Sequence, residues 1–108
     1  MSLVEDLEAV KARLLTKGWI KGRNEDEEGR CCLSGAIHRV ASDGKTWGEM
    51  TDPEYTRNLH RLDALWDTAI VPAVYRRGET SLIHFNDHIA KTVDDVIAVI
   101  DDAIAHVA

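Results

Sequence analysis

The chain has 108 residues, a length that predicts one domain over residues 1–108 with one modest hydrophobic core. Hydrophobic residues make up 44% and charged residues 30%, which is typical of a globular protein and excludes a disordered one. The net charge is −6, and because an acidic surface repels phosphate, we expect neither nucleic acid nor an anionic membrane as partner.

The cysteine content and the N-terminus point to a compartment. The two cysteines are adjacent, Cys31 and Cys32, and neighbouring cysteines rarely pair because the short loop strains the disulfide. The chain starts without an apolar signal segment, and no apolar stretch approaches the ~20 residues that span a bilayer. These features predict a reduced, cytoplasmic protein.

Apolar spacing predicts a first helix over residues 2–17. Its apolar stripe is made by Leu3, Leu7, Val10 and Leu14. Ser2 and Glu5 form a capping box at the start, and Gly18 is placed to end the helix. Residues 18–22 are then either an extended segment or a loop. The four acids of residues 25–28 indicate a solvated loop, since they lack the alternation of a calcium site.

A second helix is predicted over residues 32–41. Its apolar positions follow helical spacing and are Leu33, Ala36, Ile37, Val40 and Ala41. Gly35 lies inside this helix, where a glycine costs about 1 kcal/mol relative to alanine. Such a glycine usually marks the close approach of another backbone.

A third helix begins near Thr51 or Asp52, which serve as caps before a proline in the first turn. Its apolar face carries Tyr55, Leu59, Leu62, Leu65, Trp66 and Ala69. Pro72 is expected to kink or end it.

The last part of the chain predicts two further helices. Thr80 can cap a short segment over residues 81–87, which we interpret as helix, although an extended piece is also compatible with it. Thr92 and Asp95 form a second capping box, and the final helix runs over residues 93–107.

The expected fold is all-α: a compact bundle of four main helices plus one short helix, with a minor extended segment near Trp19 as an open alternative. We expect the bundle to pack around Trp19, Trp47 and Trp66.

Four short motifs occur in a recognisable order. They are Gly18-Trp19, the C-x-x-G-A run that starts at Cys32, Phe85-Asn86-Asp87, and the T-x-x-D-V-I run that starts at Thr92. In this order the sequence resembles a family of small bacterial and phage proteins classed as a domain of unknown function. Phe85 stands where that family usually has tryptophan, and Cys31 lies outside its motif. The resemblance implies no activity, substrate or cofactor.

Two constellations can carry chemistry. A helix N-terminus lowers a thiol's pKa, so Cys32 or Cys31 is a candidate nucleophile, with His84 or His88 as its base. The simpler interpretation is a buried Cys32 and a half-exposed Cys31 without catalytic role. His84 and His88 are four residues apart and can share a metal, with Asp87 as a further candidate ligand. Alternatively, Asn86 and Asp87 hydrogen-bond to backbone between elements.

No complete catalytic set, glycine-rich phosphate loop or dense basic run is present in the sequence. We therefore predict a non-catalytic helical interaction module without cofactor, acting through a protein partner or as a homodimer. A small thiol-dependent enzyme and a histidine-based metal-binding protein remain the alternatives.

Overall fold

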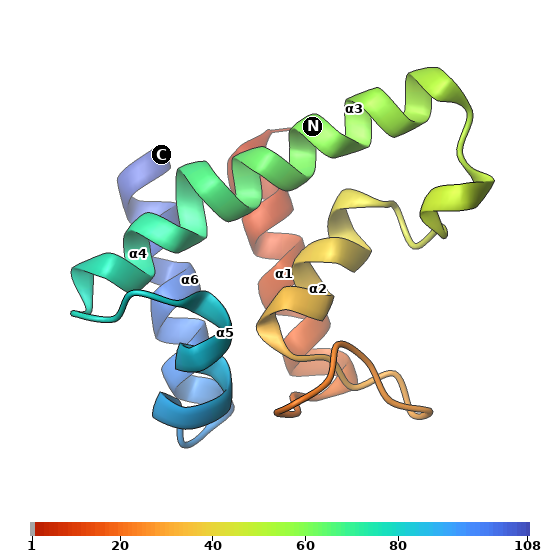
Figure 1. The fold of residues 1–108 in the computed structure, drawn as a ribbon. Helices are drawn as coiled ribbons and strands as arrows, with labels where there is room; N and C mark the ends of the chain where they lie inside the picture. Colours follow the sequence, from red (N-terminus) through yellow and green to blue (C-terminus); the bar gives the residue numbers. More distant parts are fainter. Residues whose placement is uncertain (1) are drawn as a thin grey trace.

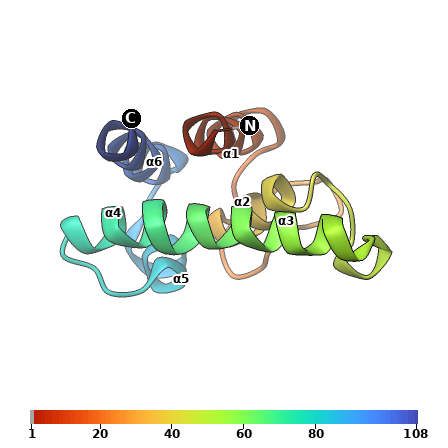
Figure 2. The same ribbon diagram turned by 90° about the horizontal axis from the view of Figure 1, so that it is seen from above.

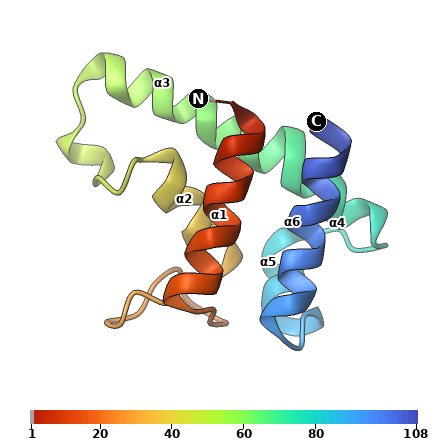
Figure 3. The same cartoon turned by 180° about the vertical axis from the view of Figure 1, so that it is seen from behind.

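The helices of the protein are arranged in two layers (Figure 1). The computed structural model describes residues 2–108. One layer is formed by α1 (Leu3–Lys17) and α6 (Val93–Val107), which pack side by side and run antiparallel (Figure 3). The other layer contains α2 (Leu33–Ala41), a long helix and α5 (Leu82–His84) (Figure 2). The long helix comprises α3 (Asp52–Asp63), a π-helical segment (Ala64–Ile70) and α4 (Val71–Arg76).

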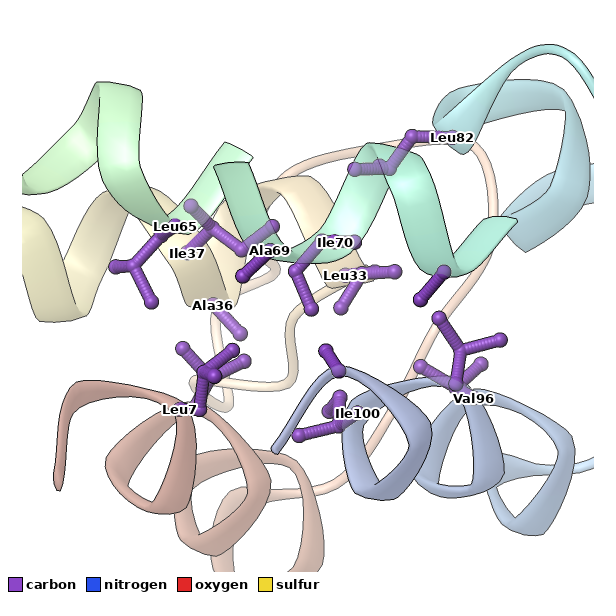
Figure 4. Packing of buried hydrophobic residues seen from close by; sticks show 14 of the residues in the cluster. Leu7, Leu33, Ala36, Ile37, Leu65, Ala69, Ile70, Leu82, Val96 and Ile100 are labelled. Atoms are coloured by element: carbon purple, nitrogen blue, oxygen red, sulfur yellow. The ribbon is translucent and has the colours of Figure 1, made fainter. Parts of the chain in front are cut away.

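The core fills the space between the two layers (Figure 4). Its largest fully buried aliphatic side chains come from both layers and include Leu7, Leu33, Ile37, Leu65, Ile70, Val96 and Ile100. Burying side chains of this size contributes roughly 1.5–3 kcal/mol each, so this contact is the main source of stability. The all-α bundle of four main helices and one short helix is confirmed. Within residues 2–108 no helix is both long and apolar enough to cross a membrane.

The ends of α1 and the start of α3 follow the predicted caps. Ser2 Oγ accepts the backbone N–H of Glu5 at 3.1 Å, and the Glu5 carboxylate accepts the N–H of Ser2 at 3.0 Å. The chain leaves α1 at Gly18, whose φ of 103° favours glycine. Thr51 caps α3 by accepting the N–H of Glu54, as predicted.

Pro72 does not end the long helix, which continues to Arg76 (Figure 2). The π-helical segment directly before it provides the reason. A proline in an α-helix lacks the N–H that bonds four residues back, and its ring crowds that carbonyl. In the wider turn, the N–H of Val71 bonds to the carbonyl of Trp66, five residues back, which relieves this crowding.

The segment predicted as a short helix is helical over a longer range than expected. α5 continues into a π-helical segment, Phe85–Ile89. The cap is Ser81, not Thr80: Ser81 Oγ accepts the N–H of His84 at 3.1 Å. Ser81 is therefore the residue that fixes where this helix begins.

The three tryptophans do not lie at the centre of the core, and that prediction is wrong. Trp19 and Trp66 are half-buried and pack against its edge, whereas the half-buried Trp47 packs against the rings of His38 and Tyr55. Phe85 is the buried aromatic side chain, 1% exposed. The two layers are close enough that aliphatic side chains fill the space between them, and the larger indole rings are accommodated at the periphery.

Between α1 and α2 the chain makes a loop with two isolated backbone bridges. Cys31 pairs with Trp19 on one side and with Glu25 on the other. The extended segment near Trp19 is therefore present, in a minimal form. The loop also passes directly over Gly35, where an added Cβ would lie 1.9 Å from the carbonyl oxygen of Asn24. The predicted close backbone approach at this glycine is confirmed.

We predict that Gly35→Ala destabilises the protein by about 3 kcal/mol or more, because the new methyl group collides with rigid backbone. Gly48→Ala is the matched control, since nothing lies within 4 Å of its Cβ position. Urea unfolding followed by circular dichroism measures both. A Gly35→Ala variant as stable as Gly48→Ala would contradict the packing described for the loop.

Candidate functional site

The buried amide of Asn86 joins three separate parts of the chain. Its Oδ1 accepts the indole N–H of Trp19 at 2.7 Å and the backbone N–H of Leu33 at 3.0 Å. Its Nδ2 donates to the carbonyl of Ile20 at 3.3 Å and to the Asp87 carboxylate at 2.9 Å. With only 1% of Asn86 exposed, these four bonds fix the loop and the start of α2 against the segment that follows α5.

Asp87 extends the same network. Its carboxylate accepts the backbone N–H of Gly22 at 2.9 Å. The hydrogen bonds from Asn86 and Gly22 hold the pKa of Asp87 below its ordinary value. Both side chains thus bond to backbone groups, as one sequence interpretation stated, and those partners lie more than 50 residues away in the chain.

A small pocket of about 100 Å³ lies beside this network. It is lined by Gly22, Arg23, Asn24, Cys32, Ser34, Leu82, Ile83, Asn86 and Asp87. Residues from two of the sequence motifs, around Cys32 and around Asn86, therefore meet at one place. His84 and His88 do not line it.

Both thiols are buried, so the expectation of a half-exposed Cys31 is wrong. Cys31 is fully buried and Cys32 is 6% exposed. Burial raises the pKa of each thiol. Cys32 is the N-cap of α2, and its Sγ accepts the backbone N–H of Gly35 at 3.4 Å. Within residues 2–108 neither thiol hydrogen-bonds to His84 or His88. The Cys31 thiol donates to the Glu25 carboxylate and the Gly29 carbonyl, and the Cys32 thiol donates to the side-chain oxygen of Asn24.

His84 and His88 lie on one exposed face, with ring centroids 5.0 Å apart. This spacing agrees with the i, i+4 relation seen in the sequence. The third candidate, Asp87, is occupied by the Asn86 side chain and the Gly22 N–H. In the described part of the chain, no group of three or more His, Cys, Asp or Glu residues is arranged to hold a metal ion.

Glu25 is the residue that the sequence interpretation missed. The sequence predicts a solvated loop at this position, but Arg39 donates to both oxygens of the Glu25 carboxylate at 2.7 Å, and Arg13 donates to one of them at 3.1 Å. The Arg39 hydrogen bonds, with the nearby charges of Arg39 and Arg13, lower its pKa to about 2. No spacing rule connects these three residues, since they come from two helices and a loop.

Comparison with known proteins gives one result. Residues 1–106 match the family described as "Family of unknown function (DUF6197)". The chain belongs to this family. No curated protein and no solved structure matches the chain. Membership in this family therefore agrees with the resemblance noted in the sequence and supplies no activity.

The lowered pKa of Glu25 predicts a loss of stability in acid. A carboxyl whose pKa is about 2 in the folded state and 4.5 ordinarily stabilises the fold above pH 4.5 and loses that effect as the pH falls toward 2. After allowance for solvent screening, we expect the stability difference between wild type and Glu25→Gln to shrink by about 1 kcal/mol between pH 6 and pH 3.

Urea unfolding at the two pH values measures this difference. Glu27→Gln is the control, because the Glu27 side chain is 87% exposed with one loose contact, 3.8 Å, to Arg23. Equal pH dependence of the two variants relative to wild type would contradict the role given to Glu25.

Proposed function

We propose that this protein is a non-catalytic interaction module that binds a basic segment of another protein through a groove lined by aromatic, aliphatic and polar side chains. The groove has a volume of about 300 Å³ and lies between the long helix and α5. It is lined by Trp66, Asp67, Val71, Tyr75, Thr80, Ser81, Leu82 and Ile83. We call it the Trp66 groove.

The observation that carries this proposal is the exposure of large apolar side chains around the groove. Tyr75 is 57% exposed and Ile83 is 53% exposed, although each lines a concave surface. Trp66 lines the same groove and is half-buried. Tryptophan and tyrosine in such positions dominate the binding energy of many interfaces, and covering them with a partner releases water from apolar surface.

The charge of the groove selects the class of partner. Asp67 lines it and Asp63 lies one turn earlier on the same helix; within residues 2–108 neither forms an ion pair. The chain as a whole carries a charge of −6, so a second copy is repelled and a basic segment is attracted. We therefore favour a different protein that presents a large apolar residue next to lysine or arginine.

The catalytic alternative has less support. A cysteine nucleophile needs a thiolate, and burial raises the pKa of Cys31 and Cys32. His84 and His88 can bind a metal ion only if further ligands come from another molecule, because the described residues bring no third ligand to them. The groove with its exposed Tyr75 and Ile83, by contrast, needs no additional component to bind a partner.

Selection of peptides from a random library against the full chain tests the proposal. We expect enriched sequences in which a large apolar residue neighbours lysine or arginine. Ile83→Ser should weaken binding of a selected peptide about tenfold, measured by fluorescence anisotropy, because it removes an anchor of the groove. Leu15→Ser should leave binding unchanged; Leu15 is equally exposed, at 56%, but lies on α1 outside the groove.

Two results would contradict the proposal. The first is the absence of such sequences, or a peptide that binds Ile83→Ser and wild type equally well. The second comes from light scattering of the purified chain, for which we expect a monomer. A dimer that Ile83→Ser dissociates would assign the groove to a second copy of this chain.

A further inference from the structure

A shallow pocket of about 390 Å³ lies between the C-terminal halves of α1 and α2, away from the Trp66 groove. It is lined by Ala9, Ala12, Arg13, Thr16, Lys17, Arg39, Val40 and Gly44. Four other pockets formed by residues 2–108 each include at least one carboxylate: Asp87, Glu25, Asp67, or Glu79 with Asp95. Here the charged lining is three cations, in a protein whose net charge is −6.

The hydrogen bonds of the three cations show that they are incompletely neutralised. Arg13 and Arg39 share a single carboxylate, that of Glu25. Arg13 donates one terminal nitrogen to Glu25 and to the carbonyl of Gly29, while its Nε is buried without an acceptor. Lys17 forms no ion pair within the described residues. Three positive charges therefore line the pocket, and the single carboxylate that pairs with two of them, that of Glu25, leaves the charge of the cluster incompletely balanced.

From this arrangement we infer that the pocket binds a small organic anion, a carboxylate or a phosphate monoester joined to a short apolar body. The anionic group lies against Lys17 and the arginines, which bind such groups through charge-assisted hydrogen bonds. The Thr16 hydroxyl provides a further donor. The apolar body covers Ala12 and Val40, two of the apolar residues of the lining.

The charge of the whole chain limits the size of this anion. A polyanion such as nucleic acid would extend past the three cations onto a surface with an excess of carboxylates, where it is repelled. A single anionic group fits within the cationic lining. This inference does not rest on the Trp66 groove, because the two pockets share no residue.

Titration of the full-length chain with hexyl phosphate, hexanoate and hexanol, followed by ¹H–¹⁵N NMR, tests the site. We expect saturable shifts at Ala12, Thr16 and Val40 with at least one of the two anions, and none with hexanol. Lys17→Gln should weaken binding about fivefold, because it removes one charge-assisted contact. Lys91→Gln removes the same charge from an exposed position outside this pocket and should change binding less than twofold.

Saturation by only one anion supports the site and identifies its headgroup. Three results would overturn the proposal: no saturation up to about 20 mM of either anion, equal binding of hexanol, or equal weakening in Lys17→Gln and Lys91→Gln. The last would reduce the effect to unspecific attraction by net charge. Because Lys17 has no ion pair to lose, its substitution is expected to preserve the fold, which the unchanged dispersion of the spectrum verifies.

Discussion

The arrangement of the loop between α1 and α2 depends on one buried amide. Asn86 uses both its oxygen and its nitrogen, and its partners come from Trp19, Ile20, Leu33 and Asp87. Each bond contributes only about 1 kcal/mol net, but leaving several buried donors and acceptors without partners costs more than that sum. The loop offers few apolar side chains to the core, so this polar anchor takes the place of hydrophobic packing there.

A second set of contacts fixes the loop from its other side. The carbonyl of Asn24 lies where only a glycine at position 35 leaves room, and Glu25 is held by Arg39 and Arg13. The thiol of Cys32 caps α2 at the same place. The cysteine, glycine and asparagine that make the sequence recognisable therefore all have structural roles in this protein. These contacts explain why the loop and the start of α2 need those residue types.

Much of the fold could be predicted from the sequence because helix spacing and caps are local. Ser2 with Glu5, Gly18 and Thr51 mark helix ends through contacts within a few residues. The errors concern contacts between distant segments. The partners of Glu25 come from two helices, and the position of the tryptophans depends on how closely the layers approach.

Two local outcomes have a different cause. The sequence predicts that Pro72 kinks or ends its helix; the helix does not end there, and a π-helical turn directly before the proline accommodates the ring. Thr80 and Ser81 are chemically similar neighbours, and only the position of the first helical N–H decides which one caps α5.

Of the candidate site residues, Cys32 and Asp87 meet at the small pocket, whereas His84 and His88 lie outside it. The Trp66 groove gave no separate signal because its apolar residues have the same spacing as core residues.

Hydrogen exchange of the Trp19 indole N–H and the Leu33 amide, compared between wild type and Asn86→Ala, tests most directly whether this amide holds the loop. The account predicts that both groups are protected in the wild type. In the variant it predicts that residues 18–33 exchange quickly while the amides of α1 and α6 stay protected. Fast exchange of the Trp19 and Leu33 groups in the wild type, or unchanged protection in Asn86→Ala, would contradict it.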